Sequence, residues 1–508
     1  MAPPDNKEHA CDWQDYAHHL EKKLKEQAGQ LEEQAGQLEE RATDLEERTA
    51  ETDILKEQLA AMKRRAFGKK SEKLPSLERE TRKQKREEDR GAQKAEALRK
   101  RRENEVAKTK LETIEVDIPV PKEQCTCPAC GNERLKSVGK GKTSTIIDYV
   151  PGYFRRRVYR RQTVKCTCGK YIVTAPPPEK ASEGSRYSEG FVAHLMVSKC
   201  ADSIPLYRLE KQYKRAGLNI SRATMNELLH RHAELLVPLC ERIFERIAED
   251  GVVLADETSI KLLHQSGKAW IWVFIANNFI GYRFSKDRSG KTPREVLGSS
   301  EGTLLVDAYT GYNSVTGADG RTRAGCLAHA RRKIFEARDA DSSAEDALDL
   351  IRRVYRVEHD AKEHGIAQSE EHLALRKKRA APAMEELHKW LDSQKDEHPP
   401  KSAMGKAIGY ALNNWTELTR FLEDARIPVD NNRSEGALRV VALGRKNFLF
   451  VGSETAGKNI AGLYSLIATC DACGVNPLQY LTDVMRRVSS HPASQIDELL
   501  PDRWKPAT

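Results

Sequence analysis

Two short apolar segments of this chain each run directly into an aspartate, and this pattern restricts the possible fold more than any other feature. Residues 252–255 precede Asp256, and residues 302–306 precede Asp307. A buried strand tolerates a carboxylate only when something pairs with it, and a divalent cation is a common partner. A single aspartate of this kind is more often a turn or capping residue. Two aspartates that each follow an apolar segment at the same position indicate one shared site.

A third acid lies far downstream. Segments 269–276 and 279–285 read as the next two strands of a meander, so that Asp307 follows a fourth strand. Pro428 and an Asn pair then predict a turn, with Glu435 near the start of the next helix. Two strand aspartates and a helix glutamate describe the acid triad of a ribonuclease-H-like nucleotidyl transferase. Such a triad can hold two Mg²⁺ or Mn²⁺ ions about 3.5–4 Å apart for attack on a phosphodiester.

Two neighbouring acids complicate this assignment. Asp430 lies five residues before Glu435 and is the alternative third acid. Glu257 follows Asp256 directly. We interpret Asp430 and Glu257 as capping residues of a turn and of a strand end.

A cysteine cluster predicts a structural zinc site. Cys127 and Cys130 form one close pair, and Cys166 and Cys168 form a second, each pair followed by glycine. Two tight turns of this kind, each with a cysteine pair, can supply the four thiolates that bind a tetrahedral Zn²⁺ ion. Cys125 is a fifth candidate, because the second pair has only one residue between its cysteines.

Between the cysteine pairs, arginines alternate with aromatic residues on an expected strand. This pattern suits contacts with a nucleic-acid backbone, and a basic face on a zinc ribbon is the alternative. The expected DNA-binding arginines are Arg155, Arg156, Arg157, Arg160 and Arg161.

The N-terminal part has a heptad pattern. Leu24, Leu31, Leu38 and Leu45 are spaced seven apart, which predicts a self-associating coiled coil and hence at least a dimer, with a solvated single helix as the alternative. From 63 to 110 the chain has 19 Lys or Arg against 9 Asp or Glu, an excess typical of polyanion binding or of a solvated linker.

A pair of helices is expected after the cysteine region. Residues 206–215 predict one helix, Gly217 its end, and Ser221 the N-cap of a helix over 222–236. This pair resembles a helix-turn-helix, although many plain helical hairpins look the same.

Composition excludes several classes of protein. No apolar run approaches the roughly 18–20 residues of a membrane span, and eleven bunched or scattered cysteines do not form a secreted disulfide framework. We therefore expect no membrane association and a location in the bacterial cytoplasm, at the nucleoid.

Several of these segments resemble transposases of the bacterial insertion-sequence family sixty-six. The resemblance covers the following segments: 55–74, the cysteine motif, 255–258, 306–313, 325–335, 427–451 and 471–484. It implies that Asp256, Asp307 and Glu435 are catalytic. It also implies contacts near the scissile phosphate from four residues on one helix, namely His329, Arg331, Arg332 and Lys333.

Two positions depart from the family pattern. Gly436 stands where the family commonly has arginine after the glutamate, and Leu327 stands where tryptophan is usual. Neither touches an acid, but loss of the arginine could weaken a phosphate contact.

These observations predict a multidomain α+β protein that cleaves and rejoins DNA at the ends of a mobile element. An inactive DNA-binding regulator and a metal-dependent nuclease are the alternatives. The expected partners are the element's double-stranded ends, target DNA, further copies of the chain and accessory proteins of the element.

The expected parts of the chain follow one another in sequence. They are a coiled-coil region (15–75), a charged linker (76–115), a zinc-binding domain (116–175), a helical DNA-binding region (185–248), a ribonuclease-H-like α/β core in two parts (249–335 and 426–468) separated by a helical insertion (336–425), and a C-terminal element (469–508).

Overall fold

The computed structural model describes most of the C-terminal two thirds of the chain. It describes residues 185–506 apart from 264–267, 318–319 and 339–340, and upstream only 17–20, 22–24, 29, 98–99, 102, 152–156, 158–160, 162–165, 172–174 and 180–182. The chain divides into two units, 1–102 and 103–508, of which the second is treated below. The four predicted zinc ligands, the heptad leucines except Leu24 and almost all of the charged linker lie outside the described residues.

A five-stranded mixed sheet forms the centre of the second unit, in the order β5-β4-β3-β6-β7. Its strands are β3 (Val252–Lys261), β4 (Lys268–Ala276), β5 (Phe279–Ser285), β6 (Thr303–Val306) and β7 (Thr322–Gly325). The first three pair antiparallel, while β6 runs parallel to both β3 and β7. The predicted meander is therefore present, and the two strands that carry the aspartates are neighbours.

β3 is longer than predicted. It continues past Asp256 to Lys261 because β4 pairs with it over this whole length, with Asp256 opposite Val273 and Lys261 opposite Lys268. The parallel pairing with β6 extends only to Leu254. Asp256 thus lies within a strand, just beyond the point where its parallel neighbour stops.

The parallel strands begin at a close approach of two glycines. Thr303 N donates to Gly251 O, and Gly302 has φ +111°. A Cβ on Gly302 would lie 2.4 Å from Gly251 O, so only glycine fits there.

Helix α16 (Glu454–Ala472) covers the outer edge of the sheet. Ser465 Oγ accepts a 2.7 Å hydrogen bond from Tyr282 N, and Thr469 Oγ1 accepts one of 3.2 Å from Ile280 N, both on the edge strand β5. The two hydroxyls thereby satisfy backbone donors that would otherwise form an open edge.

The helical region before the sheet agrees with the sequence-based prediction. It comprises α4 (Glu189–Cys200), α5 (Leu206–Arg215), α6 (Arg222–Leu235) and α7 (Val237–Ala248). Ser221 caps α6, since its side chain accepts from Thr224 N, and Gly217 ends the preceding turn with φ +85°.

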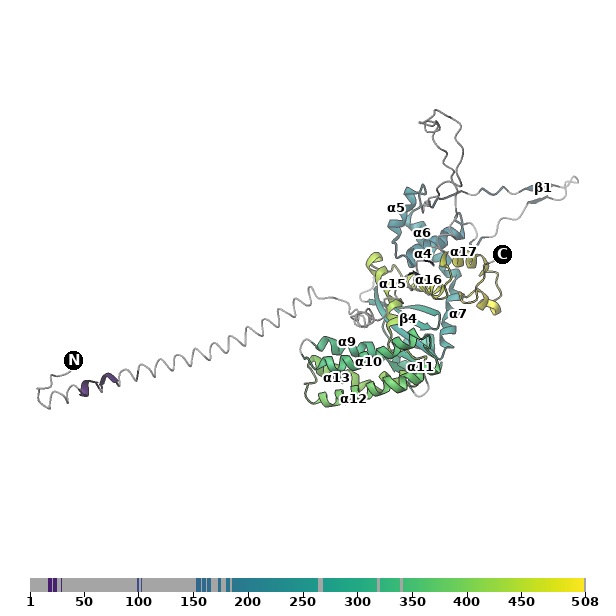
Figure 1. Cartoon of the computed structure of the whole chain (residues 1–508). Helices are drawn as coiled ribbons and strands as arrows, with labels where there is room; N and C mark the ends of the chain where they lie inside the picture. The colour runs from purple at the N-terminus through teal and green to yellow at the C-terminus, as the bar shows by residue number, and fades with distance from the viewer. Residues whose placement is uncertain are drawn as a thin grey trace, which may run out of the picture. The chain divides into compact units, whose positions relative to one another are not determined.

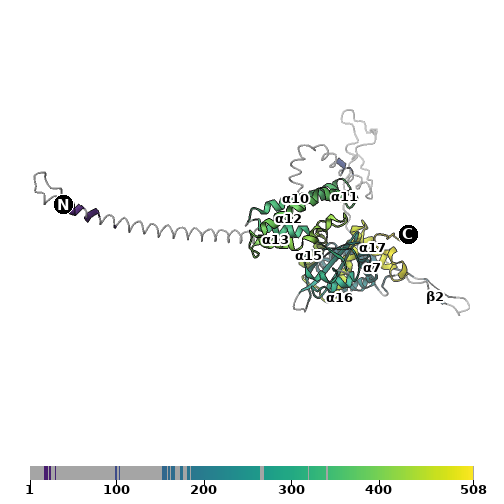
Figure 2. The same ribbon diagram turned by 90° about the horizontal axis from the view of Figure 1, so that it is seen from below.

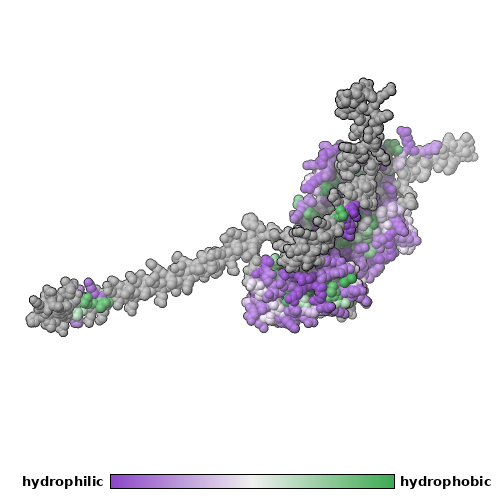
Figure 3. Space-filling view, in the orientation of Figure 1, coloured by the Kyte–Doolittle hydropathy of each residue, from purple (hydrophilic) through white to green (hydrophobic). Residues whose placement is uncertain are grey.

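The segment between β7 and the helix that begins at Asn432 consists of helices and turns, with no strand among its described residues. α8 (Lys291–Leu297) and the 3₁₀ turn η2 (Thr310–Ser314) flank β6; the later elements are α9 (Leu327–Ala337), α10 (Ala344–Glu363), α11 (Glu370–Leu375), the π-helical turn η3 (Arg376–Ala380), α12 (Ala381–Lys395), α13 (Ala403–Asn413), α14 (Trp415–Thr419), the 3₁₀ turn η4 (Arg420–Leu422) and α15 (Asn432–Phe448). Figures 1 and 2 show α10, α12 and α13 side by side as a helical layer, apart from α7 and α16. Its visible face is mainly hydrophilic in Figure 3.

The arginine-rich segment is not the expected strand. Residues 152–156 and 158–160 belong to neither helix nor strand, and the short strands β1 (Thr163–Lys165) and β2 (Ile172–Thr174) form a separate antiparallel pair. Phe154 instead packs edge-on against Phe191 and Tyr213 of the helical region, with ring centroids 6.0 and 5.2 Å apart. Aromatic packing rather than strand pairing thus positions this segment.

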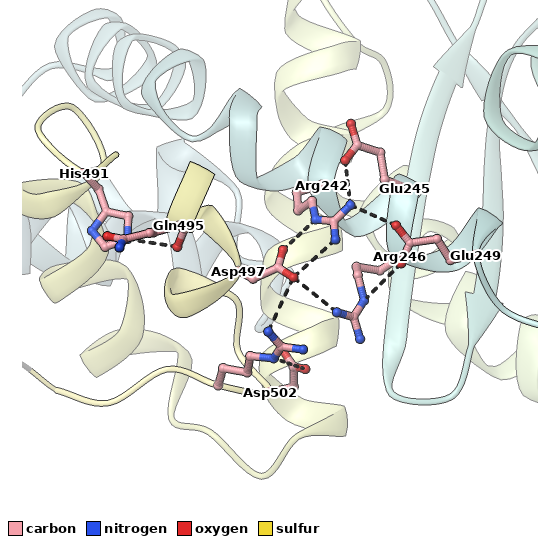
Figure 4. A network of polar contacts seen from close by, with 9 residues as sticks. Arg242, Glu245, Arg246, Glu249, His491, Gln495, Asp497 and Asp502 are labelled. Atoms are coloured by element: carbon pink, nitrogen blue, oxygen red, sulfur yellow. Dashed lines mark hydrogen bonds and ion pairs between the residues drawn. The ribbon is translucent and has the colours of Figure 1, made fainter. Parts of the chain in front are cut away.

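The C-terminal residues join the helical region through an ion-pair network. After α17 (Pro477–Arg487), the 3₁₀ helix η5 (Ala493–Leu499) carries Asp497. Asp497 accepts from Arg242 Nε at 2.5 Å and from Arg246 Nη1 at 3.3 Å, both on α7 (Figure 4). The chain end is therefore fixed to the helix that leads into β3.

Candidate active site

The three predicted acids come from three separate elements. Asp256 lies on β3, Asp307 directly follows β6, and Glu435 lies in the first turn of α15. Backbone contacts orient both aspartates, since Oδ1 of Asp256 accepts from Glu257 N at 2.8 Å and Oδ1 of Asp307 accepts from Tyr309 N at 2.9 Å.

The electrostatics of Asp256 show that the three acids act on one another. Burial raises its pKa to about 7, and the negative charges of Glu257, Asp307 and Glu435 add to this rise. Like charges raise a carboxyl pKa in this way only when they are close. The fold therefore brings together acids that are far apart in the sequence.

A buried asparagine holds α15 against β3. Asn431, the N-cap residue of α15, is 1% exposed, and its Nδ2 donates to Ala255 O at 2.8 Å. Its backbone N–H donates to Cys326 Sγ at 3.2 Å. Because Ala255 directly precedes Asp256, these contacts fix the first turn of the helix, and with it Glu435, beside Asp256.

Asp430 has a different environment from Glu435. Its carboxylate accepts from Asn432 N and from Asn432 Nδ2, at 3.1 and 2.7 Å, and interacts with the Tyr355 hydroxyl. It caps the turn before α15, as the sequence suggested.

Glu257, in contrast, is not a simple strand cap. Its side chain is 1% exposed, and it accepts from Arg288 Nε at 2.8 Å and from the Tyr312 hydroxyl at 2.6 Å. Burial raises its pKa, while these two donors oppose the rise. The strand continues beyond it, so Glu257 belongs to a buried polar network under the site.

The basic helix α9 places two of its four predicted residues at the acids. His329 Nε2 lies 3.8 Å from Glu435 Oε1, and Arg332 Nη2 lies 3.4 Å from both oxygens of that carboxylate. Burial lowers the pKa of His329. The other two lie over aromatic rings, Arg331 over Phe335 at 5.8 Å and Lys333 over Tyr410 at 4.8 Å.

The oxygen atoms of these acids and of Asn431 are chemically suited to bind a divalent cation. Among the described residues, no three Asp, Glu, His or Cys side chains stand close enough to hold a metal ion as they are placed. Nevertheless, several carboxylates share one partly buried region, and Asn431 Oδ1 is buried there without a hydrogen-bond partner among the described residues. Carboxylate and amide oxygens are the ligands that Mg²⁺ and Mn²⁺ prefer.

Of the five arginines assigned to DNA binding near the cysteines, the structure describes three. Arg155, Arg156 and Arg160 are all exposed. Arg157 and Arg161 lie outside the described residues.

Sequence reasoning missed two groups that shape the site. The Asn pair predicts only a turn at Asn431, and no local pattern predicts the Arg288–Glu257–Tyr312 network. The Asn pair before a helix was the only local signal for the first. The network depends on contacts that are distant in the sequence: Arg288 is 31 positions from Glu257, and Tyr312 is 55 positions from it.

No helix among the described residues is both long and apolar enough to span a bilayer. Fold and site together define an α/β protein with acids gathered beside the central sheet and basic side chains on the adjoining helix.

Comparison with protein families places the chain among the transposases. The family model described as Transposase IS66 family matches residues 184–459, the IS66 C-terminal element matches 465–501, and the zinc-finger binding domain of transposase IS66 matches 124–169. The chain belongs to the transposase IS66 family, and the resemblance inferred from sequence motifs is confirmed.

Similar proteins occur in Sinorhizobium fredii (strain NBRC 101917 / NGR234). The uncharacterized protein y4jD is 32% identical over 413 residues, covering 77% of this chain and 80% of its own length. The uncharacterized protein y4qI is 31% identical over 418 residues, covering 78% and 75% respectively. The similarity thus extends over most of both chains.

Proposed function

We propose that this protein cleaves and rejoins DNA strands at the ends of a mobile element, with Asp256, Asp307 and Glu435 as its catalytic acids. The observation that carries the proposal is the placement of the three acids: β3 and β6 pair side by side, and the hydrogen bond from Asn431 to Ala255 O holds the first turn of α15 beside Asp256. The strand order β5-β4-β3-β6-β7, with only the first three strands antiparallel, supports a ribonuclease-H-like core.

Divalent ions held by these acids would activate the attacking oxygen and stabilise the leaving oxygen of the phosphodiester. The protein's own groups prepare the site for this. Asn431 holds α15 in place, and the positive charge of Arg332 beside Glu435 limits the repulsion of Glu435 from the aspartates, while the imidazole of His329 lies near the same carboxylate. The Arg332 guanidinium, which lies beside Glu435, would also suit contact with a phosphate oxygen at this site.

DNA would be bound by parts outside the acid cluster. We assign this role to the zinc-binding domain (116–175), the exposed Arg155, Arg156 and Arg160, and the helical pair α5 and α6. The proposal also includes the segment boundaries given in the sequence analysis. It includes a dimer formed through the N-terminal coiled coil and accessory proteins of the element as partners.

The first test is strand cleavage and joining on duplexes that carry the element's ends. Asp256→Asn, Asp307→Asn and Glu435→Gln should each abolish both reactions while leaving end binding in gel shifts nearly intact, because the metal-stabilised charge of the transition state is lost. Glu301→Gln is the matched control, since Glu301 is exposed in the loop before β6. Glu257 is unsuitable because its replacement would leave Arg288 unpaired.

Three results would decide between the alternatives. Wild-type cleavage without joining would identify a nuclease, and binding without either reaction an inactive regulator. Activity retained by Glu435→Gln but lost in Asp430→Asn would mean that the third acid is Asp430.

The second test concerns zinc. The family's zinc-finger domain supports zinc binding, and we propose Cys127, Cys130, Cys166 and Cys168 as the ligands. Metal analysis should find one Zn²⁺ per chain, and Cys130→Ser should lose it, since three thiolates hold the ion far more weakly than four. Cys125→Ser is the control, and equal zinc content in both variants would contradict this ligand set.

A further inference from the structure

One exposed stripe of α15 starts beside the catalytic glutamate and ends in an apolar tip. Gly436, Arg439, Leu443 and Lys446 are exposed and follow one another at intervals of three or four residues, so they share one face of the helix. Just beyond the helix, Leu449 and Phe450 are 66% and 42% exposed. Large apolar side chains exposed to this extent, in sequence, are unusual on a protein surface.

Contacts with other elements hold the chain on both sides of the tip formed by Leu449 and Phe450. Before it, Asn447 Nδ2 donates to Ser203 O at 3.0 Å, and Lys199 Nζ lies 3.8 Å from the ring centroid of Phe448. After it, Val451 N donates to Lys261 O at 2.8 Å. The contacts come from α4 and its following loop on one side and from the end of β3 on the other.

Between these anchors the backbone is strained. Phe450 N donates to Phe448 O at 2.8 Å, which closes a γ-turn around Leu449 with φ 67° and ψ −41°. This form of γ-turn is rare and strained, and glycine would adopt it without penalty. A bulky leucine therefore occupies a position that favours glycine, as is common where strain serves a function.

The charges around the tip favour a polyanionic partner. Residues 439–450 contain Arg439, Arg445 and Lys446 and no acid, and of these Arg445 donates to Ser259 O on β3. A partner protein with an apolar surface would not require this excess, whereas DNA phosphates would be attracted by it.

We propose that Leu449 and Phe450 form a wedge that enters the stack of base pairs near the element's end, while Arg439 and Lys446 contact the flanking phosphates. The inference rests on the proposed function, because the DNA must lie with its reacting phosphate at Glu435. Fourteen residues of helix span about 21 Å, which places the wedge about six base pairs from that phosphate. Apolar wedges of this kind unstack base steps and bend the duplex.

Base unstacking can be measured directly with the full-length protein. Duplexes of the terminal inverted repeat would carry the fluorescent base 2-aminopurine at successive positions within about one helical turn of the end. With saturating wild-type protein, fluorescence should rise several-fold at one or two adjacent positions about six base pairs from the reacting phosphate. In the double variant Leu449→Gly with Phe450→Ala the rise should be lost, although the DNA remains bound.

The variants are chosen to preserve the fold. Leu449→Gly removes the side chain at a positive φ and relieves strain, and Phe450→Ala removes an exposed ring. Leu478→Ala, at an exposed leucine on α17, is the matched control and should leave the fluorescence unchanged.

Other outcomes would overturn the proposal. If wild-type protein binds and cleaves the duplex without any rise, or if the double variant keeps the rise, no wedge exists even though the proposed function stands. If the double variant instead loses self-association in sedimentation with its fluorescence rise intact, the tip is a protein interface. Failure of all forms to bind or cleave DNA would refute the proposed function itself.

Discussion

At the scale of single residues, Asp256 shows how the site opposes folding. Its pKa is raised to about 7, so above that pH the folded protein carries a partly buried charge that the unfolded chain carries in water. The shift disfavours folding increasingly as the pH rises from about 4, the unfolded value, to 7. A bound cation would relieve this cost.

Replacing the aspartate should therefore stabilise the metal-free protein. At pH 8, Asp256→Asn should raise the melting temperature of the core by a few degrees, corresponding to about 1 kcal/mol. Mg²⁺ should raise the melting temperature of the wild type but have little effect on the variant, because binding stabilises only a protein that has the site. Thermal unfolding with and without Mg²⁺ checks both points, with Glu301→Gln as the reference. An equal Mg²⁺ effect in all three proteins would argue against metal binding by Asp256.

At the scale of secondary structure, the cover of β5 by α16 is the contact with the clearest energetic consequence. Ser465 is fully buried, and Ser465→Ala would leave Tyr282 N–H without an acceptor. We expect a loss of about 1–3 kcal/mol in the free energy of unfolding, measured by urea denaturation. Ser490→Ala, at an exposed serine, should change it by less than about 0.5 kcal/mol. Equal stability of the two variants would mean that the hydroxyl contributes nothing to the edge.

The elements that the sequence predicted well are those defined by local signals. Ser221 caps α6 through a residue three positions away, and Gly217 ends a turn with its own positive φ. The apolar segments likewise predicted the strand that carries Asp256 and the strand that Asp307 directly follows. The family resemblance additionally predicted the order in which the segments of the protein follow one another along the chain.

What could not be predicted depends on distant contacts. The extension of β3 to Lys261 requires pairing with β4, and the burial of Glu257 requires Arg288 and Tyr312. Residues 153–161 alternate as a strand would, but Phe154 packs against helices instead. In each case the local pattern was compatible with two structures, and tertiary packing selected one.

At the scale of the whole second unit, the network in Figure 4 connects the C-terminal element to α7. The hydrogen bonds of Arg242 hold the pKa of Asp497 below its usual value. A lowered carboxyl pKa contributes stability that is present at neutral pH and is lost as the pH falls below about 4.

Asp497→Asn should accordingly destabilise the protein at pH 7, by about 2 kcal/mol. The difference from wild type should narrow as the pH falls below about 4, where wild-type Asp497 also becomes protonated. Urea denaturation across this pH range measures it, and Glu498→Gln, at a neighbouring exposed acid, is the control. A difference that stays constant with pH would show that the charge of Asp497 is not what stabilises this contact.

The cover of the sheet edge by α16 also determines when the protein becomes complete during its synthesis. All five strands leave the ribosome before the helical insertion, α15 and α16 have been made. At bacterial translation rates of about 5–20 residues per second, the delay is on the order of ten seconds. Throughout that time the edge strand β5 has no α16 to cover it, and Asp256 and Asp307 have been made without Glu435. A chain with such an open strand edge is prone to aggregation, which is the condition that chaperones relieve.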